Sequence, residues 1–144
     1  MQIKVTTPEG VIFEDEVDSA TIPTQMGEIT ILQNHIPLVS ALAPGEIILK
    51  KNNKEEYLSA GTGFIEVNKN KITILADTAE TVASLVEEEI LKAKERAEKL
   101  LQEKRNVSEV AFVEAAAALE REMSRLKIYR RRKASGKGVH ISQE

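Results

Sequence analysis

The chain has 144 residues, a formal net charge of −3 and no cysteine, which excludes disulfide bridges and thiolate metal sites. Hydrophobic residues make up 42% of the chain and aromatic residues only 3%, so any core is aliphatic. No apolar run is long enough to span a bilayer and the first residues lack the pattern of a signal peptide, so we expect a soluble, intracellular protein.

Glycine and proline are distributed unevenly along the chain. All four prolines lie in the first 44 residues, and five of the seven glycines lie at or before Gly63. Neither residue occurs between Phe64 and Ser135. Because glycine and proline mark turns, this distribution predicts a turn-rich β half followed by a helical half, and thus an α+β fold.

Short runs of alternating apolar and polar residues predict strands in the first half. Residues 46–50 and 55–59 read as a hairpin around Asn52 and Asn53, and residues 62–67 and 71–76 as a second hairpin around residues 68–70. Eight or more short strands at this spacing favour a sandwich or a flattened barrel. The glycines at 61 and 63 lack the lysine ending of a phosphate-binding loop, so we interpret them as a bend in a strand.

Residues 27–38 form the most distinctive segment, with an expected strand at 28–32 and a tight loop at 34–37. One interpretation is a docking edge formed by this loop and its neighbouring isoleucines. The other is a surface loop with a hydrogen-bonded histidine, and chemistry alone favours it, because His35 has no nucleophile or metal ligand near it in sequence.

The second half predicts two helices joined as an antiparallel hairpin over residues 84–133, followed by a disordered tail at 134–144. Residues 84–87 and 106–109 offer helix N-caps. Each helix carries one apolar stripe at 4-3-4-3 spacing: Val86, Ile90, Ala93, Ala97 and Leu100, then Phe112, Ala116, Leu119, Met123 and Leu126. Because the stripes are narrow and rich in alanine, the hairpin needs the β half or another protein to pack against, and it is a candidate two-state switch.

Catalysis is not expected from these residues. No serine–histidine–aspartate or cysteine–histidine set can be assembled, and residues 87–89, three consecutive glutamates, are interpreted as a complement to the dipole of a helix N-terminus.

A basic cluster ends the second predicted helix, with eight basic and two acidic residues between 120 and 137. It can be a solvated face, a nucleic-acid surface or a ligand for an acidic protein segment. The overall acidity and the single aromatic residue in the cluster weigh against nucleic acid. Arg121 and Arg125 lie off the apolar stripe, so we expect them to remain available when the hairpin is folded.

Several segments, in this order, resemble the epsilon subunit of bacterial F-type ATP synthases. They are Gly27-Glu28-Ile29, His35-Ile36-Pro37-Leu38, Leu42-Ala43-Pro44-Gly45, residues 59–67, residues 73–77, Arg96-Ala97 and Met123-Ser124-Arg125-Leu126. The resemblance implies a ten-stranded β-sandwich over residues 1–83 followed by the regulatory two-helix hairpin. It also implies a non-catalytic rotor subunit of the central stalk, peripheral to the cytoplasmic face of the plasma membrane, which couples proton translocation to ATP synthesis.

The resemblance implies partners and contact residues as well. The sandwich would bind the gamma subunit and rest on the c-ring, with Glu28, Ile29, Ile31 and His35 as the rotor contact. The hairpin would inhibit ATP hydrolysis by extending, so that basic residues meet the catalytic beta and alpha subunits. These inhibitory residues are Arg121, Arg125, Lys127, Arg130, Arg131 and Arg132. No contact with nucleic acid and no insertion into the membrane are implied.

Some members of that family bind ATP on the folded hairpin, although no cofactor is otherwise implied. The corresponding residues here are Glu89, Lys92 and Ala93, with Arg121 and Arg125 as further contacts. Lysine at position 92 cannot make the planar two-pronged contact with phosphate that arginine makes. The alternative to the whole reading is a stand-alone adaptor that binds acidic protein or nucleic acid through the basic helix.

Overall fold

A computed structural model describes residues 1–104 and 107–136 of the chain. This part of the chain forms ten strands, one 3-10 helix and two α-helices. The strands are β1 (Gln2–Thr7), β2 (Gly10–Glu16), β3 (Ser19–Thr24), β4 (Gly27–Leu32), β5 (Leu38–Leu42), β6 (Gly45–Lys51), β7 (Lys54–Ala60), β8 (Gly63–Asn68), β9 (Lys71–Ala76) and β10 (Ala79–Thr81). The helices are η1 (Val82–Ser84), α1 (Glu87–Lys104) and α2 (Glu109–Ser135).

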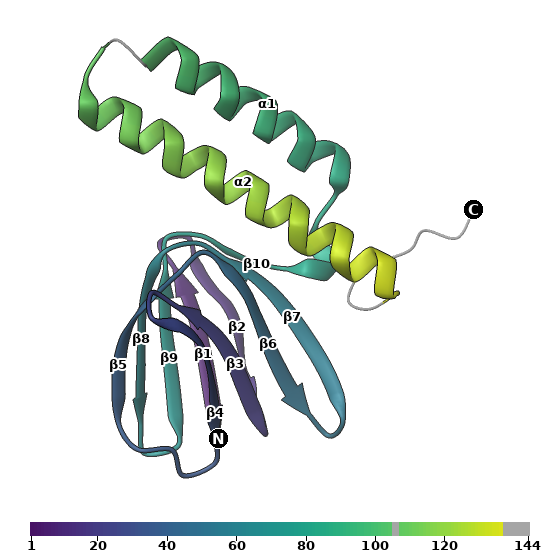
Figure 1. The fold of residues 1–144 in the computed structure, drawn as a ribbon. Helices are drawn as coiled ribbons and strands as arrows, with labels where there is room; N and C mark the ends of the chain where they lie inside the picture. Colours follow the sequence, from purple (N-terminus) through teal and green to yellow (C-terminus); the bar gives the residue numbers. More distant parts are fainter. Residues whose placement is uncertain (105–106, 137–144) are drawn as a thin grey trace.

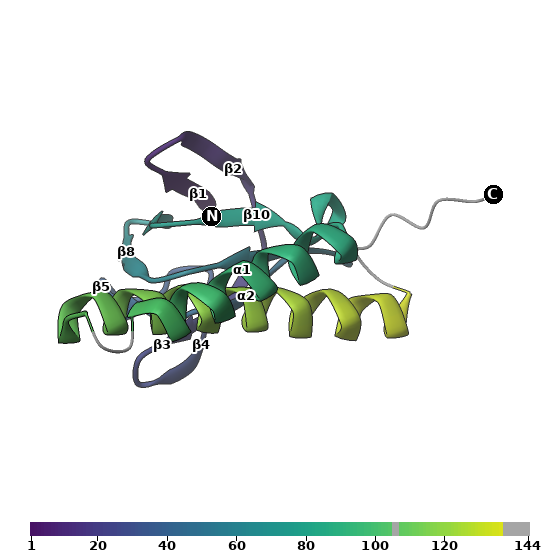
Figure 2. The ribbon, with the colours of Figure 1, turned by 90° about the horizontal axis from the view of Figure 1, so that it is seen from above.

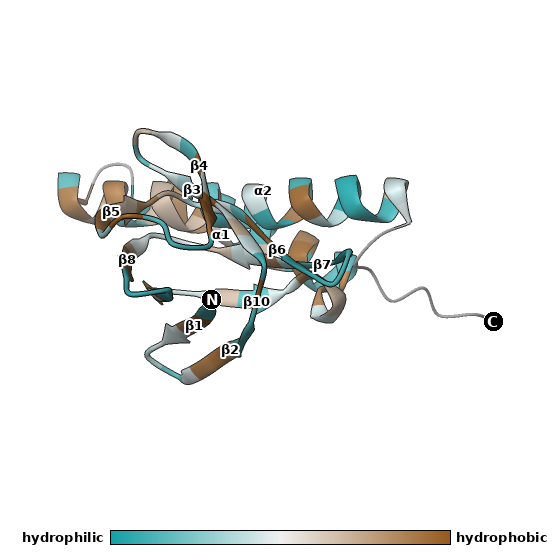
Figure 3. Cartoon of the chain, turned by 90° about the horizontal axis from the view of Figure 1, so that it is seen from below, coloured by the Kyte–Doolittle hydropathy of each residue, from teal (hydrophilic) through white to brown (hydrophobic). Residues whose placement is uncertain are grey.

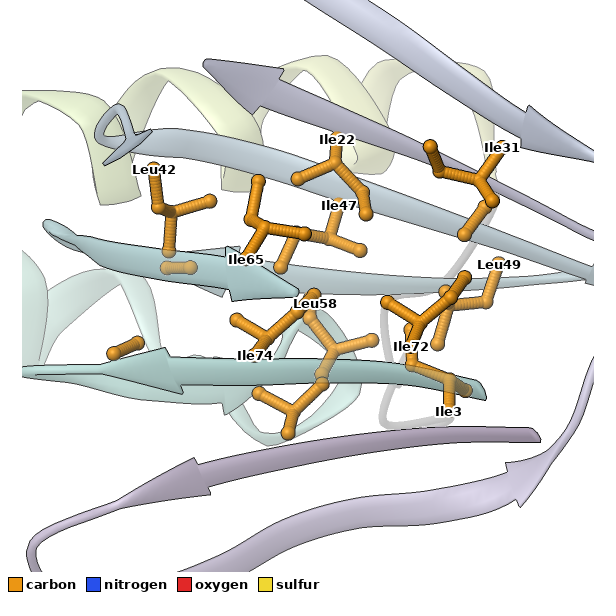
Figure 4. Close-up of a cluster of buried hydrophobic side chains, with 14 of the residues drawn as sticks. Ile3, Ile22, Ile31, Leu42, Ile47, Leu49, Leu58, Ile65, Ile72 and Ile74 are labelled. Atoms are coloured by element: carbon orange, nitrogen blue, oxygen red, sulfur yellow. The ribbon is translucent and has the colours of Figure 1, made fainter. Parts of the chain in front are cut away.

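The ten strands form a β-sandwich, as predicted (Figure 1). They pair in the order β10-β7-β6-β3-β5-β8-β9-β1-β2, and β4 pairs with β3. The β1–β9 pair is parallel and the other pairs are antiparallel. Alternate residues point inward and build an aliphatic core (Figure 4). Its fully buried large members include Ile3, Ile22, Ile31, Leu42, Ile47, Leu49, Leu58, Ile65, Ile72 and Ile74.

Both predicted hairpins are confirmed, and their turns explain why. Asn52 and Asn53 have φ values of 51° and 64°, and Lys69 and Asn70 have φ values of 50° and 59°. Two successive residues with positive φ match the twist of a two-residue hairpin turn, and asparagine tolerates this backbone region well.

The glycines between β7 and β8 serve close packing of the backbone. A Cβ atom at Gly63 would lie 1.9 Å from the carbonyl oxygen of Leu75, and one at Gly61 would lie 2.1 Å from a carboxylate oxygen of Asp77. At Gly63 the obstacle is backbone, so only glycine fits, whereas at Gly61 it is the side chain of Asp77. No helix follows this segment directly. The bend predicted here is therefore confirmed.

The ends of the helices differ in part from the prediction. The hydroxyl of Ser108 caps α2 as predicted, accepting a hydrogen bond of 3.0 Å from the backbone N–H of Ala111. Ser84 does not cap α1, because its hydroxyl donates to the carbonyl of Thr81, the residue just before η1. Helix α2 reaches Ser135, two residues beyond the expected end, and stops at Gly136 with a φ of 71°. The rest of the predicted tail, residues 137–144, lies outside the described residues.

The hairpin lies across one end of the sandwich, with α2 next to the strands and α1 beyond it (Figures 1 and 2). Helix α2 contacts β6, β7 and η1. A second apolar cluster joins the hairpin to the sandwich. It consists of Tyr57, Val82, Leu85, Ile90, Leu126, Ile128 and Tyr129, with Ile48 packed against it.

The predicted apolar stripe of α2 is only partly buried. Leu126 is buried, whereas Phe112 and Met123 keep a third to a half of their surface exposed. The buried face is rotated by about one position and runs through Ala115, Glu122, Leu126 and Tyr129. The prediction was wrong here because it counted apolar residues alone, while the inward face of α2 carries both ion pairs with the sandwich and the apolar cluster.

Candidate functional site: the interface between hairpin and sandwich

Two carboxylates on the outer face of the sandwich receive the arginines of α2. Glu80 of β10 is the register partner of Ser59 of β7, and Ser59 is the register partner of Glu46 of β6. Register partners in neighbouring strands point to the same face of a sheet, so these three residues form one row across three strands. We call Glu80, Ser59 and Glu46 the acidic row.

Glu46 is the most deeply buried acidic side chain of the row, with 4% of its surface exposed. Arg131 donates to it through Nη2 at 2.5 Å, and Arg132 donates through Nε at 2.8 Å and also through Nη2. The guanidinium carbon of Arg132 lies 4.0 Å from the centre of the Tyr57 ring. The hydrogen bond to Glu46 raises the pKa of Arg132 above its usual value. Glu46 and Tyr57 thus hold Arg132 from two sides.

Glu80 binds Arg125 in the same way, at the other end of the row. Arg125 donates through Nη2 at 3.2 Å and also through Nε, which makes a two-pronged contact. Its Nη1 donates to Glu122 of α2 at 2.5 Å. Burial acts to lower the pKa of Arg125, but the hydrogen bonds to Glu80 and Glu122 outweigh it and raise the pKa.

The spacing of the two arginines matches the spacing of the row. Arg125 and Arg132 are seven residues apart, which is two helical turns and about 10.5 Å along α2. Glu80 and Glu46 are separated by two strand spacings, about 9.6 Å. Helix α2 crosses the ends of these strands (Figure 1). A two-turn repeat on the helix therefore matches the separation of the two carboxylates that bind Arg125 and Arg132.

The inhibitory residues predicted from the sequence therefore have different positions. Three of them, Arg125, Arg131 and Arg132, pair with carboxylates of the sandwich, and Arg125 also pairs with Glu122 of α2. The expectation that Arg125 stays available in the folded hairpin was therefore wrong. Arg121 makes two longer ion pairs, of 3.9 Å with Asp77 and 4.0 Å with Glu122. Lys127 is exposed. The basic cluster in the sequence identified the arginines, but no sequence pattern identified Glu46 and Glu80 as their partners.

The candidate ATP residues are not brought into one site. Glu89 and Lys92 are exposed on α1, and Lys92 pairs with Glu88 at 3.3 Å. Arg121 and Arg125 instead line a cavity of about 260 Å³ together with four carboxylates, those of Glu9, Asp77, Glu80 and Glu122. Asp77, Glu80 and Glu122 pair with these arginines and so occupy the positions next to the guanidinium groups that a phosphate would need.

The candidate rotor-contact residues are spread along β4. Glu28 is exposed near the start of the strand, and Ile29 packs against the core. Ile31 is completely buried in the core, so it cannot be a surface contact in this structure. His35 follows the other end of the strand, with its Nδ1 2.7 Å from the carbonyl of Ile36. About 13 Å of strand separates Glu28 from Leu32, just before that loop.

The sandwich carries an exposed apolar surface that the sequence did not predict. Phe64 of β8 pairs with Leu75 of β9, and Leu75 is linked through Thr6 of β1 to Val11 of β2. Phe64, Leu75 and Val11 all have more than half of their surface exposed, and Figure 3 shows an apolar stretch in β2. We call Val11, Leu75 and Phe64 the apolar row. The alternation of inward and outward residues within each strand contains part of this information, but only the pairing register of the strands brings the three outward side chains together.

Two classes of site are not seen in residues 1–104 and 107–136. This part of the chain contains no group of three or more histidine, aspartate or glutamate side chains that could hold a metal ion. Neither of its α-helices is long and apolar enough to cross a membrane.

The fold and this interface define a class of protein. Residues 1–82 match the family model of the beta-sandwich domain of the ATP synthase delta/epsilon chain. The chain is 38% identical over 128 residues to the ATP synthase epsilon chain of Halalkalibacterium halodurans. The aligned residues cover 89% of this chain and 96% of that relative. It is 40% identical over 121 residues to the epsilon chain of Desulfitobacterium hafniense strain Y51, covering 81% and 92%. The chain belongs to the ATP synthase epsilon chain family.

Two solved structures share the fold of this chain. A chain in the Euglena gracilis mitochondrial ATP synthase, described as OSCP/F1/c-ring in rotational state 1, is 26% identical and superimposes with a TM-score of 0.69, covering 85% of this chain and 76% of that chain. A chain of the Tetrahymena thermophila mitochondrial ATP synthase central stalk and c-ring shares the fold at 16% identity and a TM-score of 0.57.

Proposed function

We propose that this protein is a non-catalytic rotor subunit in the central stalk of a proton-translocating ATP synthase. Its sandwich binds the gamma subunit and rests on the c-ring, and its hairpin restrains ATP hydrolysis. The family supports the place in the complex, and the Euglena neighbour comes from an assembly that contains F1 and the c-ring. In this proposal the subunit is peripheral to the cytoplasmic face of the plasma membrane and couples proton flow to ATP synthesis.

One observation supports the regulatory part of the proposal. The arginines of α2 are held by carboxylates of the sandwich through exchangeable ion pairs, while the apolar contact is one small cluster. An acidic segment of a catalytic beta or alpha subunit could replace those carboxylates. The extended helix would span roughly 40 Å from its first to its last residue, at 1.5 Å per residue. In this state Arg121, Arg125, Lys127 and residues 130–132 contact the catalytic subunits.

Two exposed surfaces support rotor contacts by the sandwich. The apolar row is suited to the gamma subunit, since apolar surfaces of this kind mark protein interfaces. The loop around His35, with the exposed side chains of Leu32 and Ile36, is suited to the c-ring. Glu28 and Ile29 lie nearer the other end of β4 and add to the gamma contact in this proposal.

Deletion of the hairpin tests the regulatory role. Removing residues 84–144 leaves the ten strands intact in sequence, so the truncated subunit should still assemble, and ATP hydrolysis by the membrane-bound complex should rise. The measurement is ATPase activity of membranes at equal content of catalytic subunits. Unchanged hydrolysis with normal incorporation of the truncated subunit would contradict inhibition by the hairpin.

We further propose that the folded hairpin needs no bound nucleotide. The carboxylates of Asp77, Glu80 and Glu122 already neutralise Arg121 and Arg125, and added phosphate would face repulsion from them. Titration calorimetry of the isolated chain with millimolar ATP should show no binding heat. A saturable heat that disappears in Arg125→Gln would overturn this part of the proposal.

A further inference from the structure

Consecutive basic residues at the end of α2 have two different partners. Arg131 and Arg132 bind Glu46 of the sandwich, whereas Arg130 and Lys133 bind Glu87 of α1, at 3.1 Å and 3.7 Å. Residues three apart share one side of a helix, which explains the division. The pairs with Glu87 lie inside the hairpin. The pairs with Glu46 exist only while the hairpin is docked on the sandwich.

We propose that Glu46 and Glu80 form a regulatory latch, which holds Arg132 and Arg125 and competes for them with the acidic segment of a neighbouring subunit. This inference rests on the proposed function of α2 as the inhibitory helix, and it adds the element of this chain that opposes inhibition. The latch can compete because each of its two carboxylates makes a two-pronged contact with an arginine, and an acidic segment of a neighbouring subunit would bind the arginines through the same kind of contact.

Glu46 contributes most to the latch. Its side chain is 4% exposed and that of Arg132 is 14% exposed, whereas Glu80 is 33% exposed. Breaking a buried charge pair from one side leaves the other charge without a partner, which is costly in the docked state. The same charge is hydrated in the undocked state. Loss of the Glu46 carboxylate therefore shifts the equilibrium toward undocking, and loss of the Glu80 carboxylate shifts it less.

A single thiol can report undocking in the isolated full chain. The sequence has no cysteine, and Ser59, buried between Glu46 and Glu80, can be replaced by cysteine with little change in shape. The thiol in Ser59→Cys reacts with a maleimide reagent when the hairpin leaves. In this background Glu46→Gln should accelerate the reaction at least about tenfold, and Glu80→Gln should accelerate it less.

Two comparisons distinguish undocking of the hairpin from a general loss of protein stability. Glu87→Gln is the matched control, since it removes a carboxylate that also binds two basic residues but lies within the hairpin, and it should change the rate less than twofold. Arg132→Gln should accelerate the reaction, and adding Glu46→Gln to it should produce less than the product of the two single effects. Unchanged reactivity in Glu46→Gln, or equal acceleration by Glu87→Gln, would overturn the latch.

ATP hydrolysis by the assembled complex separates the latch from the inhibitory function. Glu46→Gln keeps every arginine of α2, so inhibition should strengthen. Hydrolysis should fall, by at most the factor by which the ratio of undocked to docked hairpins rises. Faster thiol reaction together with unchanged hydrolysis would support the latch and contradict the inhibitory role. An unchanged thiol reaction would refute the latch whatever the hydrolysis rate.

Discussion

Tyr57 connects the sandwich to the hairpin at the scale of single residues. Its hydroxyl donates to Glu55, its ring lies under Arg132, and its side chain belongs to the cluster that contains Leu126 and Tyr129. Burial, and then the hydrogen bond to Glu55, raise the pKa of Tyr57 to about 12. The docked structure thus favours the neutral phenol, which can donate to a carboxylate and offer its ring face to a guanidinium.

The raised pKa of Tyr57 can be measured directly. Tyr129→Phe leaves Tyr57 as the last tyrosine, and its absorbance as tyrosinate should titrate with a midpoint near 12 in the folded chain and about 10 in urea. Because the folded state binds the proton more tightly, this contribution to stability is fully present below pH 10 and is lost as the pH rises toward 12. A folded-state midpoint near 10 would contradict the burial of this hydroxyl in solution.

At the scale of elements, the residues of each turn and cap predicted the two β-hairpins and one helix cap. The face of α2 that docks on the sandwich could not be predicted in this way. Asn52 and Asn53 carry the backbone preference of their turn in their own side chains, and Ser108 caps the helix that follows it. Glu46 and Glu80 bind arginines that are 86 and 45 residues away. Their partners depend on the register of three strands and on the crossing of α2, which no local pattern contains.

The cap at Ser108 predicts a measurable contribution to the hairpin. Ser108→Ala removes the acceptor for the backbone N–H of Ala111 and should destabilise the first turn of α2 by about 1 kcal/mol. Amide hydrogen exchange over residues 109–113 measures the change. Ser108→Asp, which keeps a capping oxygen and suits the positive end of the helix, should exchange as slowly as the unaltered chain. Equal exchange in all three proteins would contradict a capping role.

At the scale of the whole molecule, the sandwich offers two surfaces of different chemistry. The outer face of β10, β7 and β6 carries the acidic row and binds the hairpin through charges. The outer face of β8, β9 and β2 carries the apolar row, which the hairpin does not cover. Since the two rows lie on separate strands, the hairpin can undock without uncovering or disturbing the apolar row. Regulation and attachment to the stalk can therefore operate independently.

This separation predicts that attachment depends on the apolar row and not on the hairpin. Phe64→Lys combined with Leu75→Lys should reduce co-purification with the gamma subunit at least about tenfold, because burying two large apolar side chains contributes several kcal/mol. Both side chains are exposed, so the variant should fold normally. Val113→Lys is the matched control, since it places a lysine on the exposed surface of α2 and should leave recovery unchanged. If the double variant is recovered with gamma as fully as this control, the apolar row is not the attachment surface, and the contact must lie elsewhere on the sandwich.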